Sequence, residues 1–115
     1  MTIHIHTHNE WDPLREVVLG SAVGAQIPKV RDASLHAVDY GALDDEAFAR
    51  IPTGPYPKRV IEETTEDLDR FAADLTRLGI RVHRPAPADF TEVRRTADWA
   101  VDGYYAYCPR DTILT

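Results

Sequence analysis

Three histidines near the start of the chain, His4, His6 and His8, are spaced two residues apart. In a β-strand, residues at this spacing share one face, so three imidazoles could converge on a zinc or copper ion. Zinc also needs a fourth ligand and neighbouring groups that orient each ring, and no carboxylate is tied to this segment by spacing. We therefore expect the solvated face of an edge strand here, and we predict no metal site.

The single cysteine, Cys108, is the only thiol nucleophile in the chain. A catalytic cysteine needs a nearby histidine or another positive group that favours the thiolate. Nothing in the spacing brings His83 or His36 beside it, and Pro109 removes one backbone N–H that could stabilise an oxyanion. We therefore expect Cys108 to be a buried structural thiol.

Asp111 follows Arg110 and precedes an apolar run, which is a common position for a functional carboxylate in α/β proteins. It could bind a guanidinium through two parallel hydrogen bonds, but spacing alone favours a surface salt bridge or a turn cap. Asp98 beside Trp99 leaves the same alternatives open. Trp11 and Trp99 are expected to be core or interface aromatics.

The elements that must position these side chains are those of an α/β fold. Apolar or near-apolar residues recur in steps of three and four from Ile61 to Leu78, which predicts a helix between Pro57 and Gly79. A short strand over 80–83 follows this helix. We also expect a buried strand over 14–19, a short helix within 34–50 that begins near Asp44, a loop over 51–57, and irregular structure over 85–102. The acidic run over 62–69 is expected to be an exposed helix face.

The composition excludes several classes of protein. The chain has 115 residues and a formal net charge of −6, and no basic stripe that would bind nucleic acid is visible. No apolar run approaches the roughly 18 residues that span a bilayer, and the start of the chain shows no secretory signal. One cysteine excludes an internal disulfide. A cytoplasmic protein with no membrane partner is the expectation.

Three segments in order resemble the arginine-dependent amidinotransferases. They are NEWDPLREVVLG at 9–20, an acidic helix running into LGIRVHRPAP at 62–87, and TADW followed by YCPRD and an apolar run at 95–114. The segment IPTGPYPKRVIEET is more similar to the inosamine-phosphate amidinotransferases of bacterial aminoglycoside pathways than to glycine amidinotransferases.

The resemblance implies a five-bladed α/β propeller of ββαβ modules, the pentein fold, of which this chain would be the N-terminal third. It implies transfer of an amidino group from arginine to an amine through a cysteine intermediate, with no metal or organic cofactor. By the same resemblance Asp111 contacts the guanidino group. Cys108 falls on a variable position, so residues 1–115 would hold no catalytic residue.

Residues 1–115 are accordingly expected to be the N-terminal part of a single amidinotransferase catalytic domain, apparently truncated. Its partners would be small-molecule substrates, and a homodimer stays open. A non-catalytic α/β binding module of the same fold is the alternative from a different functional class. A metal-binding protein that uses His4, His6 and His8 is a third reading of the same sequence.

Overall fold

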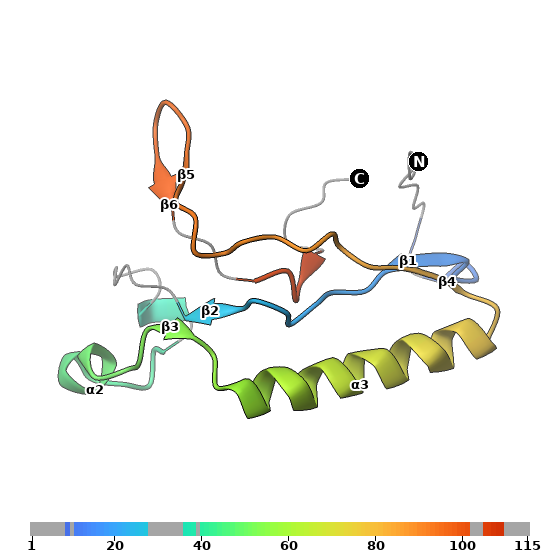
Figure 1. The fold of residues 1–115 in the computed structure, drawn as a ribbon, viewed down its shortest axis with the longest axis horizontal. Helices are drawn as coiled ribbons and strands as arrows, with labels where there is room; N and C mark the ends of the chain where they lie inside the picture. Colours follow the sequence, from blue (N-terminus) through green and yellow to red (C-terminus); the bar gives the residue numbers. More distant parts are fainter. Residues whose placement is uncertain (1–8, 10, 28–35, 39, 102–104, 110–115) are drawn as a thin grey trace.

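The computed structural model describes residues 9, 11–27, 36–38, 40–101 and 105–109. Within these ranges, the chain contains both short strands and helices, so the predicted α/β class is confirmed for the described part (Figure 1). The elements, in chain order, are β1 (Glu16–Val18), β2 (Gln26–Ile27), α2 (Asp45–Ala49), β3 (Gly54–Pro55), α3 (Lys58–Arg77), β4 (Arg81–His83), β5 (Arg94–Arg95) and β6 (Ala100–Val101).

Helix α3 is the longest element, and its bounds agree with the predicted helix between Pro57 and Gly79. It ends in a Schellman motif, in which Ile80 N–H donates to the Leu75 carbonyl and Gly79 N–H donates to the Thr76 carbonyl. Gly79 has a φ of +81°, a conformation that glycine adopts without the steric cost that other residues incur. This cap turns the chain sharply from α3 into β4.

The apolar stripe of α3 is only partly covered. Leu68 and Leu75 are buried, whereas Phe71 and Leu78 are exposed. The acidic face is exposed as predicted, and its charges pair along the helix. Lys58 pairs with Glu62, Arg59 with Glu63, Arg70 with Asp67, and Arg77 with Asp74. Such solvent-exposed pairs stabilise a helix by only a few tenths of a kcal/mol each.

Strands β1 and β4 pair in parallel, with Glu16 opposite Arg81 and Val18 opposite His83. Helix α3 leads directly into β4 and packs against it, as in a βαβ crossover (Figure 1). The strand predicted over 14–19 is present, but it is shorter than expected and its valines are only half-buried. The expectation of a buried strand is wrong because, among the described residues, β1 has a strand neighbour on one side alone.

Two antiparallel pairs lie in regions that the sequence did not predict as strands. Strand β2 pairs with β3, which lies inside the predicted 51–57 loop, and β5 pairs with β6 inside the region expected to be irregular. The loop prediction is wrong at Gly54–Pro55 because the pairing partner, Gln26–Ile27, is distant in sequence. Proline is tolerated in this strand because edge strands do not need every N–H.

Helix α2 begins where the sequence predicts. The Asp44 carboxylate accepts a hydrogen bond of 2.8 Å from Ala47 N–H, and Asp45 and Glu46 place negative charge in the first turn. Phe48 on this helix is buried under the His36 ring, with ring centroids 4.4 Å apart and planes 6° from parallel. Helix α2 is therefore fixed by a cap and by one aromatic stack.

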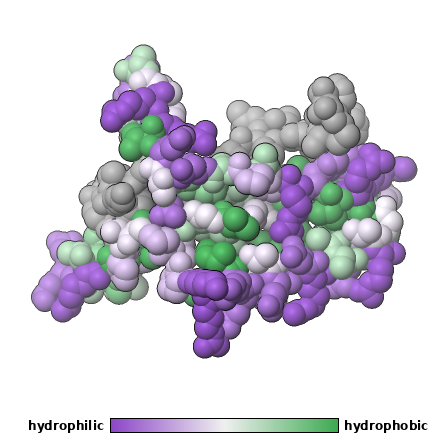
Figure 2. Space-filling view, viewed as in Figure 1, coloured by the Kyte–Doolittle hydropathy of each residue, from purple (hydrophilic) through white to green (hydrophobic). Residues whose placement is uncertain are grey.

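The core of the described part is small. Its buried hydrophobic residues are Ala22, Ala25, Phe48, Leu68 and Leu75. Trp11 is 81% exposed and Trp99 is 55% exposed, so neither is a core residue of the described part, and the alternative that they are interface aromatics stays a prediction. Figure 2 shows hydrophobic surface between α3 and the strands, bordered by hydrophilic residues. Much apolar surface of the described part thus faces solvent.

Over the described ranges, no helix is both long enough and apolar enough to cross a membrane.

Candidate functional site

The segment after β1 lies against residues 105–109, which are distant from it in sequence. Ser21 N–H donates a 2.9 Å hydrogen bond to the Ala106 carbonyl, and the two residues form an isolated antiparallel bridge. Gly20 makes this approach feasible, because a Cβ at position 20 would lie 1.8 Å from the Tyr107 carbonyl oxygen. The glycine that ends the NEWDPLREVVLG motif is therefore required by backbone packing.

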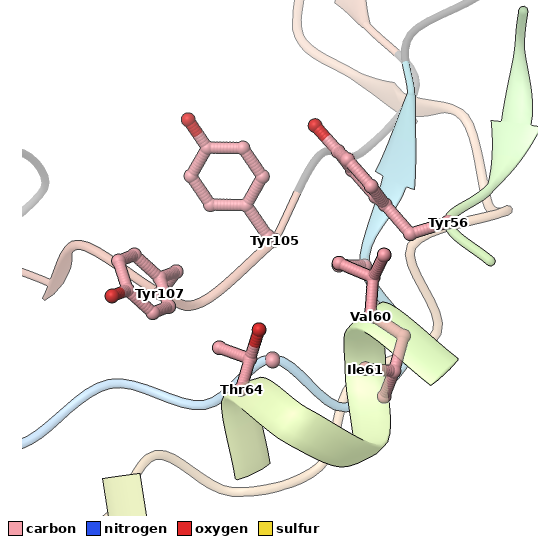
Figure 3. Close-up of a pocket in the computed structure, with 8 residues that line it drawn as sticks. Tyr56, Val60, Ile61, Thr64, Tyr105 and Tyr107 are labelled. Carbon is pink, nitrogen blue, oxygen red and sulfur yellow. The ribbon is translucent and has the colours of Figure 1, made fainter. Parts of the chain in front are cut away.

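A pocket of about 310 Å³ opens beside this contact (Figure 3). Three tyrosines border it, Tyr56, Tyr105 and Tyr107, and the first turns of α3 form its floor through Val60, Ile61 and Thr64. Ala22 and Ala25 complete the lining. A volume of this size is at the lower end of those that hold small organic ligands.

The backbone holds the two sides of the pocket together. Tyr56 N–H donates to the Ala25 carbonyl at 3.3 Å, next to the β2–β3 pair. Pro57 then starts α3, which carries Val60, Ile61 and Thr64 to the floor. Tyr105 and Tyr107 flank Ala106, the residue that bridges to Ser21. The pocket therefore depends on contacts between segments that are far apart in the chain.

A charged cluster joins β1 to β4. His83 Nε2 donates to the Glu16 carboxylate at 2.9 Å, and Arg81 Nη1 donates to the other carboxylate oxygen at 2.6 Å. The hydrogen bond from His83 lowers the pKa of Glu16 below its ordinary value, and the charges of Arg81 and His83 add to this effect. The cluster reinforces the strand register, because Glu16 lies opposite Arg81 in the parallel pair.

Among the candidate site residues, the structure corrects the prediction for Cys108 and leaves those for Asp111 and the N-terminal histidines untested. Cys108 is exposed, so the expectation of a buried thiol is wrong, since it lies on the surface segment that follows the Ala106 bridge. His83 hydrogen-bonds Glu16, as described above. Asp111, His4, His6 and His8 lie outside the described residues. Over the described ranges, no group of three or more His, Cys, Asp or Glu side chains could hold a metal ion.

The sequence reasoning missed the tyrosine pocket. The only sequence signal was the alternation of Tyr105, Ala106 and Tyr107, which places both rings on one side of an extended segment. Tyr56 lies in a proline-rich stretch that was predicted only as a loop. Periodicity describes neighbours within one element, so it could not show that these three residues meet.

The chain is similar in sequence to several amidinotransferases. The chain is 50% identical over 111 residues to inosamine-phosphate amidinotransferase 1 of Streptomyces griseus, covering 96% of this chain and 31% of that protein. It is 34% identical over 116 residues to the L-arginine:L-lysine amidinotransferase of Pseudomonas savastanoi pv. phaseolicola, covering 98% of this chain and 31% of the relative. No family model matches the chain.

The solved structures agree with this sequence similarity. The inosamine-phosphate amidinotransferase StrB1 of Streptomyces griseus matches with a TM-score of 0.76 and 51% identity, over 90% of this chain and 29% of that one. SxtG, an amidinotransferase of Microseira wollei in saxitoxin biosynthesis, matches with a TM-score of 0.62 and 31% identity, over 89% and 27%. In sequence and in fold, this chain is similar to amidinotransferases, and it spans about a third of the length of the bacterial relatives it matches.

Proposed function

We propose that this chain is the N-terminal part of an arginine-dependent amidinotransferase and supplies one substrate-binding carboxylate, Asp111. The observation that carries the proposal is 50% identity over 111 residues to an enzyme whose fold the described part shares. The exposed apolar residues of α3 and the partly covered β1–β4 pair support a larger fold around it. That fold is the five-bladed propeller of ββαβ modules implied by the family resemblance.

The proposed reaction transfers the amidino group of L-arginine to an amine. A cysteine thiolate from outside this chain attacks the guanidino carbon, the bond to the ornithine nitrogen breaks, and ornithine leaves after that nitrogen gains a proton. The acceptor amine then attacks the amidino carbon and displaces the thiolate. Catalysis of this kind depends on holding the planar guanidinium in one orientation.

Asp111 would supply that orientation. A carboxylate accepts two parallel N–H bonds from a guanidinium, and such charge-assisted bonds are shorter and stronger than neutral ones. The pairing also retains the positive charge that makes the guanidino carbon electrophilic. Asp111 follows Tyr107 by four positions, and Tyr107 belongs to the segment that Gly20 and Ser21 hold in place.

The acceptor that we favour is an inosamine phosphate rather than glycine. The chain is 50% identical to the inosamine-phosphate amidinotransferase of S. griseus and 31% identical to the mitochondrial glycine amidinotransferase of Danio rerio. A non-catalytic binding module of the same fold is the second candidate. This reading requires no nucleophile from outside the chain, and the exposed Cys108 and the Glu16-bonded His83 are both compatible with it.

A chimera tests the proposal. The matching segment of the S. griseus enzyme is replaced by this chain, and ornithine release from arginine is measured with an amine acceptor. We expect the chimera to release ornithine at a rate within about tenfold of the host enzyme, since half of the aligned residues are identical. A chimera that folds, as judged by circular dichroism and thermal unfolding, but releases no ornithine contradicts the proposal.

A further inference from the structure

We propose that Gly20 is a positioning residue for the arginine-binding carboxylate of Asp111. This inference rests on the function proposed above, and it adds a residue that acts through Asp111 rather than on the substrate. Gly20 leaves room for the backbone of Tyr107, and Tyr107 begins the short segment that leads to Asp111. The position of the carboxylate thereby depends on the absence of a side chain at the end of a distant motif.

Gly20 is required by space rather than by backbone conformation. Its φ is not positive, unlike that of Gly79, so alanine could adopt the same backbone conformation. A Cβ at position 20 would instead lie 1.8 Å from the Tyr107 carbonyl oxygen and 2.8 Å from the Ala106 carbonyl oxygen. Both oxygens belong to the main chain, so no side-chain rotation could relieve the clash.

Strand β1 fixes the place of Gly20 in the fold. Leu19 N–H donates a 2.9 Å hydrogen bond to the His83 carbonyl in β4, and Ser21 N–H donates a 2.9 Å hydrogen bond to the Ala106 carbonyl. Gly20 is buried between these two bonds. It therefore lies where the chain changes its hydrogen-bonding partner from β4 to Ala106, and a side chain there must separate the two backbones.

The chain between Tyr107 and Asp111 is short and stiff. The four residues after Tyr107 span at most about 14 Å when extended. Pro109 holds its own φ near about −65°, and its ring disfavours helical conformations at Cys108. We therefore expect a displacement of Tyr107 to be passed on to Asp111 rather than absorbed between them.

Alanine at position 20 would move this segment by a distance that matters for binding. A Cβ essentially never lies within 3.0 Å of such an atom, so the Gly20 and Tyr107 backbones would separate by more than about 1 Å. Two parallel hydrogen bonds between a carboxylate and a planar guanidinium require a fixed geometry. A misplacement of about 1 Å can cost about 100-fold in rate.

The test is a double-mutant cycle in the chimera described above. Gly20→Ala should raise the KM for arginine and lower kcat/KM about 10- to 100-fold, whereas a loss of folded enzyme alone would lower kcat and leave KM unchanged. In a chimera that already carries Asp111→Asn, Gly20→Ala should lower kcat/KM by less than about threefold, because both substitutions act on the same carboxylate. Equal losses in the two backgrounds would overturn the inference.

Gly79→Ala is the matched control for the added methyl group. A Cβ at position 79 meets no atom within 4 Å, so the KM for arginine should stay within about twofold of that of the unsubstituted chimera. If Gly79→Ala raises the KM as much as Gly20→Ala does, the effect is not specific to the contact with Tyr107 and the inference is wrong.

Pro109→Gly decides the question if Gly20→Ala does not fold. This substitution leaves the close approach of Gly20 and Tyr107 in place and removes the restriction on the chain that leads to Asp111. The KM for arginine should rise at least about threefold, while hydrogen exchange of the Ser21 amide stays slow. An unchanged KM would show that this segment does not position the carboxylate.

The two proposals fail separately. A folded chimera that releases no ornithine overturns the proposed function, and with it the positioning role. An active chimera in which Asp111→Asn lowers kcat/KM for arginine, while Gly20→Ala leaves it unaltered, overturns the positioning role alone.

Discussion

The Cα of Gly20 faces the backbone of Tyr107 so closely that a methyl group at position 20 would lie 1.8 Å from the Tyr107 carbonyl oxygen. We therefore expect Gly20→Ala to push residues 105–109 away and to break the Ser21–Ala106 bridge. Overpacking of this kind costs about 1–3 kcal/mol of unfolding free energy. Urea unfolding measures the loss, and hydrogen exchange of the Ser21 amide reports on the bridge.

Gly79→Ala is the control for this substitution. Gly79 has a positive φ that alanine adopts at a cost, but a Cβ there meets no atom within 4 Å. The Gly79→Ala substitution should lower the free energy of unfolding by about 1 kcal/mol, while hydrogen exchange of the Ser21 amide stays slow. Equal protection of the Ser21 amide in both variants would show that the close approach does not fix the segment.

The Glu16–His83 bond predicts a pH-dependent contribution to stability. The folded-state pKa of Glu16 lies below the ordinary value of 4.5, chiefly because His83 donates a hydrogen bond to the carboxylate. Its stabilisation is therefore complete above pH 4.5 and is lost as the pH falls through the lower folded-state pKa. The stability difference between the natural chain and Glu16→Gln should shrink over that range, as measured by urea unfolding at several pH values.

Glu66→Gln, on the exposed face of α3, is the matched control for loss of one carboxylate. If the difference in unfolding free energy between Glu16→Gln and the natural chain stays constant with pH, the role given to His83 is contradicted.

The N-terminal cap of α2 predicts how substitutions of Asp44 change the stability of the chain. Asp44→Ala removes the acceptor of the Ala47 N–H bond and should cost about 1 kcal/mol. Asp44→Asn keeps a capping oxygen and should cost less than half as much. Thermal unfolding distinguishes the two, and equal losses would show that charge rather than the cap hydrogen bond is responsible.

The sequence predicted the elements that depend on local pattern. The period of α3 and the glycine at its end are properties of neighbouring residues, and both are confirmed. Strand β3 and the β5–β6 pair were missed, because a two-residue strand is defined by its partner rather than by its own alternation. The burial of β1 was overestimated because valine content indicates a strand but not how many neighbours cover it.

The residues of the candidate site, too, were predicted only in part. The role of Asp111 stays a prediction that rests on the resemblance of the YCPRD segment to the amidinotransferases. The tyrosine pocket could not be predicted, because its residues come together through backbone contacts between distant segments, Ser21 with Ala106 and Ala25 with Tyr56. Cys108 was expected to be buried because free cysteines generally are. It is exposed because it lies on a surface segment that follows the Ser21–Ala106 bridge.

The 115-residue chain alone should not catalyse transfer. Its one cysteine is not the proposed nucleophile, and the side chain of His83 is bonded to Glu16. We expect no ornithine above background when the purified chain is incubated with arginine and an amine, with the S. griseus enzyme as the positive control. Ornithine release that disappears in Cys108→Ser would contradict this expectation and assign the thiol a catalytic role.

The most direct test of the central claim is the arginine dependence of the chimera carrying Asp111→Asn. The substitution removes the charge that would pair with the guanidinium, and a charge-assisted hydrogen bond contributes about 1.5–3 kcal/mol. We predict a kcat/KM for arginine about 10- to 100-fold lower, measured as ornithine release, while Asp67→Asn on the exposed face of α3 leaves it unchanged. An Asp111→Asn chimera with unaltered kcat/KM for arginine would contradict the claim that this chain supplies a substrate-binding carboxylate.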